Sequence, residues 1–259
     1  MDQKTKKAKE KIKEKVLKVA MSIPSEGHTL PESYDNHIMM SFHLGRLQEL
    51  WNHEKRNPRY EFYWHTSGRL LTAMARERLI NEAKKAGVDY ILMYDDDMIL
   101  PLDMVECMLQ DVELHPEIDI LAPLAFMRNP PHYAVMYTVI EGFDPTRGPY
   151  YINQFVKNYP RNSLVECDAV GFGAVLIKMS IIEKMKPPYC FSTTGSGEDV
   201  FFCQKAKKEA RARIFMDTRI KLGHLAQPQI VDEEYFDNWR RKNKHFIPKV
   251  PGKYKTTEK

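Results

Sequence analysis

The chain has 259 residues, of which 43% are hydrophobic and 11% aromatic, so it can bury one large core and we expect one domain. No apolar run reaches the roughly 18 residues that a membrane span needs, and the lysine-rich start lacks the apolar stretch of a signal peptide. These absences predict a soluble, cytoplasmic protein. The four cysteines have no CxxC spacing, which argues against a zinc knuckle and against a disulfide framework.

The net charge of +4 is distributed unevenly along the chain. Residues 1–18 carry eight lysines against three acidic residues, and residues 240–259 carry eight lysines or arginines against Glu258, so the part between them is acidic. Basic ends are typical of proteins with an acidic partner, such as nucleic acid or a phospholipid surface. Frayed, solvated chain ends are the alternative explanation.

In the first half of the chain, apolar runs that predict strands alternate with periodic segments that predict helices. We expect strands at 16–23, 60–64, 88–94 and 118–122, and helices at 34–52, at 70–86 with Gly87 as its end, and after Pro101. This alternation predicts an α/β fold with a mostly parallel sheet, in which ligands bind beyond the carboxyl ends of the strands. The loop after Pro24 and the triplet Asp95-Asp96-Asp97 both fall at such ends.

The second half is less regular. Residues 123–165 are rich in Pro, Tyr, Asn and Arg, and we expect long loops and short strands that shape a pocket. A glycine-containing turn with Gly171 and Gly173 then leads into an apolar strand, a further strand is predicted at 213–217, and a final helix at 231–246.

Three adjacent carboxylates at the end of a strand repel one another, and a hard divalent cation such as Mg²⁺ or Mn²⁺ would offset that cost. Alternation along an extended chain would place Asp95 and Asp97 on one side and Asp96 on the other. An acidic turn with solvated carboxylates is the alternative.

Further polar residues lie near predicted element ends. Glu198 and Asp199 stand where an amphipathic helix begins, so they are either functional or stabilise the helix through its dipole. His224 follows a strand and is a candidate metal ligand, although a lone histidine is more often a packed residue.

Across residues 16–226 the order of these segments resembles the GT-A glycosyltransferases, especially those like family 2. The matching pieces are Val19-Ala-Met-Ser-Ile-Pro, Ala75-Arg-Glu-Arg, the DxD motif Asp95-Asp-Asp, Gly171-Phe-Gly-Ala, the ED motif Gly197-Glu-Asp-Val, and His224. The resemblance implies a Rossmann-like, mostly parallel sheet flanked by helices, with a smaller antiparallel part on the acceptor side. It places this domain at 16–230, between a basic extension of residues 1–15 and a helix with a basic tail at 231–259.

On the donor side, the resemblance implies a nucleotide-sugar held by residues from several of these motifs, with UDP-sugar favoured and GDP-sugar as the alternative. The implied donor residues are Ser22, Pro24 and Glu26 for the base and ribose, Arg76 or Arg78 for the base or diphosphate, and Asp95 and Asp96. The implied cofactor is Mn²⁺ or Mg²⁺, bound by Asp97, Asp95 and His224, which stabilises the departing diphosphate.

On the acceptor side, the resemblance implies that Asp199 is the general base of an inverting reaction, with Glu198 as its neighbour. Asp168, Gly171 and Gly173 are the implied acceptor-binding residues. Related GT-A enzymes include retaining ones, which do not need this base, so inversion is favoured and retention stays open. The sequence departs from the family at the first loop, which lacks an asparagine after the proline, and at Glu77, where an asparagine often follows the arginine.

Other functions remain open at this point. A sugar nucleotidyltransferase would need a glycine-rich phosphate loop with a basic residue after the first strand, and Pro24-Ser-Glu-Gly-His has no Lys or Arg. A non-catalytic nucleic-acid-binding protein on the same fold, or an enzyme with a polyanionic acceptor, would explain the basic ends. The aromatic residues Tyr133, Tyr137, Tyr150 and Tyr151 could stack on sugar rings, although packing on a sheet is the more ordinary role.

Overall fold

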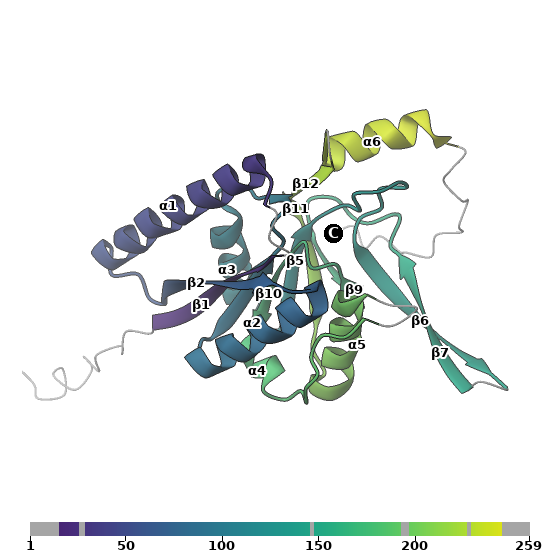
Figure 1. Cartoon of the computed structure of the whole chain (residues 1–259), viewed down its shortest axis with the longest axis horizontal. Helices are drawn as coiled ribbons and strands as arrows, with labels where there is room; N and C mark the ends of the chain where they lie inside the picture. Colours follow the sequence, from purple (N-terminus) through teal and green to yellow (C-terminus); the bar gives the residue numbers. More distant parts are fainter. Residues whose placement is uncertain (1–15, 26–28, 146–147, 193–196, 227–228, 245–259) are drawn as a thin grey trace, which may run out of the picture.

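A computed structural model describes residues 16–25, 29–145, 148–192, 197–226 and 229–244 of the chain (Figure 1). The predicted basic extension at 1–15, the end of the basic tail and Glu26 lie outside the described residues. No helix within these ranges combines the length and the apolar character that a membrane crossing requires.

The centre of the fold is a seven-stranded sheet. Its strand order is β2 (Arg59–Arg69), β1 (Val16–Ser25), β3 (Tyr90–Tyr94), β10 (Ala174–Lys178), β5 (Ile120–Leu124), β11 (Ile214–Lys221) and β8 (Leu164–Cys167). The strands β2, β1, β3, β5 and β11 run in one direction, and β10 and β8 run against them. The prediction of an α/β fold with a mostly parallel sheet is therefore confirmed.

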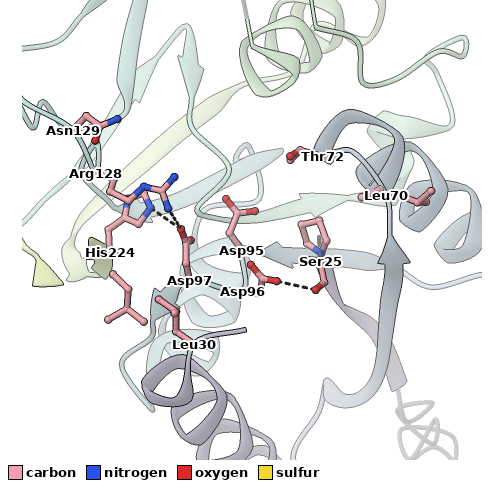
Figure 2. A pocket seen from close by; sticks show the side chains of 13 residues that line it. Ser25, Leu30, Leu70, Thr72, Asp95, Asp96, Asp97, Arg128, Asn129 and His224 are labelled. Atoms are coloured by element: carbon pink, nitrogen blue, oxygen red, sulfur yellow. Dashed lines mark hydrogen bonds and ion pairs between the residues drawn. The ribbon is translucent and has the colours of Figure 1, made fainter. Parts of the chain in front are cut away.

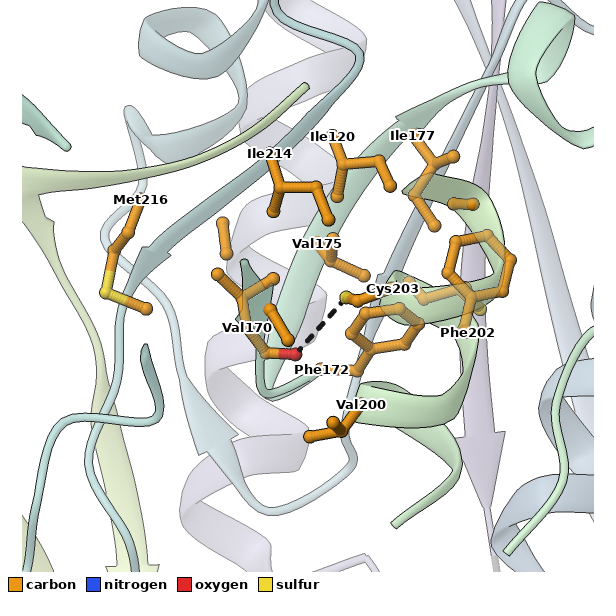
Figure 3. Close-up of a cluster of buried hydrophobic side chains, with 14 of the residues drawn as sticks. Ile120, Val170, Phe172, Val175, Ile177, Val200, Phe202, Cys203, Ile214 and Met216 are labelled. Atoms are coloured by element: carbon orange, nitrogen blue, oxygen red, sulfur yellow. Dashed lines mark hydrogen bonds between the residues drawn. The ribbon is translucent and has the colours of Figure 1, made fainter. Parts of the chain in front are cut away.

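Helices cover both faces of this sheet because its strands are apolar on both sides. On β3, Ile91 and Met93 pack into the core under α2 (Thr72–Ala86), α4 (Met179–Ile182) and α5 (Glu198–Ala210). The alternate residues Leu92 and Tyr94 pack with α1 (Pro31–His53) and α3 (Met104–Leu114). Figure 3 shows the first core, where the Cys203 thiol of α5 donates to the Val170 carbonyl at 3.8 Å.

Two small antiparallel sheets flank the main one. The first joins β13 (Gln229–Val231), β12 (Gly223–Ala226) and β4 (Met98–Ile99), and the second joins β7 (Gly148–Phe155), β6 (Met136–Asp144) and β9 (Ala169–Val170). The expectation of long loops over residues 123–165 is wrong in part, because β6 and β7 form a long hairpin that projects from the body (Figure 1). The two strands pair locally, but their apolar pattern is interrupted, so the sequence pattern did not predict strands of this length.

The tyrosines of this region divide into two groups. Tyr133 and Tyr137 pack against Phe155, with ring centroids 5.2 Å and 4.8 Å away, so packing on a sheet describes them best. The side chains of Tyr150 and Tyr151 lie outside the described residues.

The final helix, α6 (Glu233–Lys242), lies over the loop that follows β5 (Figure 1). Asp232 caps it by accepting the Tyr235 N–H at 2.7 Å, and Phe236 packs on Phe126 with ring centroids 4.9 Å apart. The helix predicted at 231–246 is thus confirmed over residues 233–242. The other predicted helices are also present, and Gly87 ends α2 with a φ of 62° in the left-handed region, which favours glycine.

Two glycines provide a test of the packing. A Cβ at Gly171 would meet the Val135 Cβ at 2.7 Å, whereas a Cβ at Gly45 on the exposed side of α1 would meet nothing within 4 Å. Gly171→Ala should therefore lower the free energy of unfolding by about 1–3 kcal/mol through overpacking, and Gly45→Ala should raise it by roughly 0.5–1 kcal/mol. Urea denaturation of both variants measures these changes, and an unchanged midpoint for Gly171→Ala would contradict the close approach.

Candidate functional site

The three aspartates that follow β3 line a cavity of about 750 Å³ at the carboxyl ends of the parallel strands (Figure 2). Its walls come from the end of β1, the start of α2, the loop after β5, and β12. The lining residues are Pro24, Ser25, Leu30, Leu70, Thr72, Ala75, Asp95, Asp96, Asp97, Arg128, Asn129, His224 and Leu225.

The three carboxylates contact three different partners. Asp95 contacts Arg76, Asp96 accepts the Ser25 hydroxyl at 2.8 Å, and Asp97 lies against His224 and Arg128. The predicted strand alternation fails here because the chain turns after Asp95, whose carbonyl accepts the Met98 N–H at 3.3 Å. Spreading the carboxylates among separate partners reduces their mutual repulsion while keeping all three on one cavity wall.

Arg76 joins the two acidic motifs of the chain. Its side chain is 3% exposed, and Nη2 donates to Asp95 Oδ1 at 2.6 Å while Nη1 donates to Glu198 Oε1. The Phe172 carbonyl accepts a further bond at 3.3 Å, and the guanidinium lies 5.3 Å from the centre of the Phe172 ring. Arg76 therefore fixes the end of β3 to the first turn of α5, and it is not among the residues that line the cavity.

The charges around Arg76 influence one another. Burial alone would lower the pKa of Arg76, but the carboxylates of Asp95, Glu198 and Asp199 raise it, so its charge is retained. Burial raises the pKa of Asp199 above its usual value, partly offset by the Arg76 charge. Asp199 Oδ1 accepts the Val200 N–H at 2.7 Å, as expected for an acidic residue in the first turn of a helix.

His224 and Asp97, both predicted as metal ligands, face each other at the cavity. His224 Nδ1 lies 2.8 Å from the Phe126 carbonyl oxygen, which can only accept, so this nitrogen carries the proton and Nε2 faces Asp97 Oδ2 at 3.2 Å. A backbone acceptor on the far ring nitrogen is the arrangement that orients histidines toward metals. Burial lowers the pKa of His224, but the hydrogen bond and the charge of Asp97 outweigh burial and raise it overall.

These residues suit a cation that is shared with a substrate. Within the described ranges, no group of three or more histidine, cysteine or acidic side chains could hold a metal ion alone. One carboxylate and one imidazole leave most coordination positions to water and phosphate oxygens, which is how Mg²⁺ is commonly bound in phosphate-using sites. Asp95, predicted as a third ligand, lines the same cavity and accepts from Arg76 through Oδ1.

Several predicted donor residues lie elsewhere. Ser22 is fully buried within β1 and does not line the cavity, so it cannot contact a base or ribose there. Arg78 points away, because two positions along a helix turn a side chain by about 200°. It is 55% exposed and bonds Glu82 and the Ser67 carbonyl. Pro24 and Asp96 do line the cavity.

The residues predicted to bind the acceptor each have a structural role in the fold. Asp168 accepts the Val139 N–H at 2.9 Å, pairs with Lys207, and lines a separate cavity beside α5. Gly171 is required by the approach of Val135, and a Cβ at Gly173 would lie 3.2 Å from Met98 Cε. The Gly173 carbonyl accepts the Asp95 N–H at 3.0 Å, so this turn supports the aspartates from behind.

The sequence reasoning missed Arg128 and Asn129. Both lie in the loop after β5, beyond the carboxyl end of a parallel strand, and this position is the signal that could have identified them. It also left Glu77 unexplained. Glu77 Oε2 accepts the N–H groups of Tyr189 and Cys190 at 2.7 and 2.9 Å, which anchors this segment to α2.

The pairing of Arg76 predicts a large effect of its removal. Arg76→Met leaves the partly buried carboxylates of Asp95 and Glu198 without their buried cation, so the free energy of unfolding should fall by about 3–5 kcal/mol. Arg78→Met, in the same helix but exposed, should change it by less than about 0.5 kcal/mol. Urea denaturation at pH 7 compares the two variants, and equal effects would contradict the bridging role of Arg76.

The chain aligns with several solved structures, although no sequence match is found. Neither a protein-family profile nor a curated protein sequence matches the chain. Among solved structures, A197 from STIV aligns with a TM-score of 0.50 and 15% identity over 83% of this chain and 94% of that chain. GalNAc-T7 with UDP, GalNAc and Mn2+ aligns with a TM-score of 0.44 and 12% identity, over 80% of this chain and 44% of that chain. An apo UDP-glucose pyrophosphorylase aligns with a TM-score of 0.44 and 8% identity, over 90% of this chain and all of that chain. At 15% identity, the likeness to A197 from STIV is one of fold.

Proposed function

We propose that the chain is a metal-dependent glycosyltransferase that moves a sugar from a nucleoside-diphosphate donor to an acceptor hydroxyl. The observation that carries the proposal is the joining of two acidic motifs beside the main cavity, which Asp95, Asp96 and Asp97 line and Glu198 and Asp199 do not. Asp95 to Asp97 and the helix start at Glu198 and Asp199 are about a hundred residues apart in sequence, and one buried arginine bridges them. An acidic turn of solvated carboxylates would not need such an arrangement.

The donor would lie across two connected cavities. Beside the main cavity is a smaller one of about 370 Å³, which shares Ser25 and Asp96 with it and is lined by Tyr34, Trp64 and other aromatic residues. Aromatic faces suit a nucleobase, and the hydrogen-bonded pair of Ser25 and Asp96 stands between the two spaces where a ribose would pass. The diphosphate would then reach Asp97 and His224.

Asp97 and His224 would hold Mn²⁺ or Mg²⁺ together with the diphosphate oxygens. When bound, the metal would supply Lewis-acid stabilisation of the negative charge on the leaving diphosphate. The chain itself contributes the orientation of this site, because the Phe126 carbonyl fixes the His224 ring and the Leu225 N–H donates to the Asp97 carbonyl at 2.9 Å.

Asp199 would act as the general base in an inverting reaction. Its carboxylate would take the proton of the acceptor hydroxyl while that oxygen attacks the anomeric carbon, and a raised pKa brings a base closer to its working pH. Glu198, held by Arg76, would fix the position of the helix start that carries Asp199.

Nucleotide binding is the first test of the proposal. With Mn²⁺, one of UDP, GDP, CDP and dTDP should raise the free energy of unfolding by about 2.7 kcal/mol at a hundredfold excess over its dissociation constant. A thermal-shift panel with Mn²⁺, Mg²⁺ or EDTA measures this. Asp97→Asn should abolish the shift, and Asp35→Asn, an exposed aspartate of α1, should keep it. The proposal fails if no nucleotide gives a metal-dependent shift in the wild type.

The role of Asp199 predicts a pH dependence. A base must be unprotonated, so kcat/KM should rise with pH through a midpoint above the usual aspartate value, because burial raises this pKa. The rate is measured as hydrolysis of a nucleotide-sugar whose nucleotide is the one that stabilises the protein in the thermal-shift panel. Asp199→Asn should slow this hydrolysis by about 10²- to 10⁴-fold. Retention at the anomeric carbon, seen by NMR, would remove the assignment of Asp199 as base. Release of pyrophosphate from a nucleoside triphosphate and a sugar phosphate would instead indicate a nucleotidyltransferase.

A further inference from the structure

Arg128 enters the main cavity from the loop after β5 and contacts the same oxygen atom as His224. Its Nη1 lies 3.0 Å from Asp97 Oδ2, and His224 Nε2 lies 3.2 Å from that oxygen (Figure 2). The Arg128 side chain is 54% exposed, whereas the Arg76 side chain is 3% exposed. The oxygen that would bind a metal is therefore already in contact with an exposed cation.

The lining of the main cavity is mainly acidic, so an exposed arginine there would be important for binding a negatively charged ligand. Asp95, Asp96 and Asp97 bring three negative charges to the lining, and among the described lining residues Arg128 is the one arginine or lysine. Arg76, behind the wall, is shared between Asp95 and Glu198. A nucleoside diphosphate carries further negative charge, so its entry requires positive charge beyond that of the aspartates' present partners.

The loop that carries Arg128 is anchored from behind. His132 is 2% exposed, and its backbone N–H donates to the Asn129 carbonyl at 3.1 Å. Its ring Nδ1 lies 3.0 Å from the Met127 carbonyl oxygen. The His132 ring meets Tyr235 and Trp239 of α6 edge-on at 5.1 Å and 5.5 Å. The backbone at Arg128 is thus held at the cavity rim while its side chain can change partners.

We propose that Arg128 is a diphosphate-contacting residue that holds the place of the cation on Asp97 until metal and nucleotide bind. This inference rests on the proposed function. Asp97 and His224 would hold the metal, and its positive charge would repel the guanidinium of Arg128 from Asp97. The freed guanidinium then pairs with a phosphate oxygen, for which its planar donors are suited, and stabilises the charge on the leaving group.

Because of this exchange, one substitution should have two opposite effects. Arg128→Gln removes the competitor from Asp97, so Mn²⁺ alone should bind several-fold more tightly. The same variant loses a charge-assisted hydrogen bond to the diphosphate, so the dissociation constant of UDP or GDP at saturating Mn²⁺ should rise by roughly tenfold or more. Binding of the matching monophosphate, UMP or GMP, should change much less.

The experiment is calorimetric titration of the wild type, Arg128→Gln, Arg128→Lys and the control Arg46→Gln. Arg46 is an exposed arginine of α1 outside the lining of the cavity, so its variant should match the wild type. Arg128→Lys keeps the charge and should fall between the wild type and Arg128→Gln. Each protein is titrated with Mn²⁺ alone, and then with UDP, UMP, GDP and GMP in Mn²⁺.

The outcomes separate the two proposals. If the wild type binds none of UDP, GDP, CDP and dTDP with Mn²⁺, the proposed function fails and the role of Arg128 fails with it. If the wild type binds one of them, the role of Arg128 is overturned when Arg128→Gln weakens diphosphate and monophosphate alike, as a merely structural residue would. It is also overturned when Arg128→Gln binds Mn²⁺ alone no more tightly than the wild type does.

Discussion

The site depends on one buried positive charge. Arg76 lies on α2, yet its guanidinium satisfies a carboxylate from the end of β3 and another from the first turn of α5. Without it both partly buried carboxylates would lack a cation, and partial burial of an unpaired charge is costly. The two acidic motifs therefore occupy fixed positions relative to each other, and their separation in sequence no longer matters.

The remaining aspartates are stabilised by weaker, more exposed partners, and this difference has a chemical meaning. Asp96 is held by the Ser25 hydroxyl, and Asp97 shares one oxygen between an imidazole and an exposed arginine. The cation next to Asp95 is 3% exposed, whereas the arginine next to Asp97 is 54% exposed. Both features would suit the proposed binding and release of a charged diphosphate.

Short-range patterns in the sequence predicted most of the central elements. Apolar runs identified β1 and β3, helical spacing identified α1 and α2, and the aspartates at the end of β3 line the cavity, as their position at the carboxyl end of a strand suggested. The sequence could not separate Arg76 from Arg78, since only the packing of α2 decides which one faces the carboxylates. Nor could it show that Ser22 faces the core or that Asp168 pairs with Lys207, because both depend on contacts between distant segments.

Glu77 makes the segment before α5 depend on α2 as well. Its carboxylate, one residue after Arg76, receives two adjacent backbone N–H groups from Tyr189 and Cys190, so a single helix holds both the carboxylates and the segment that leads toward α5. An ionised carboxylate has only acceptor atoms, which suits two N–H donors better than an asparagine side chain would. In a chimaera, α2 and residues 187–192 should therefore come from the same parent protein. A crossover point between them would separate the Glu77 carboxylate from the two N–H groups that it accepts.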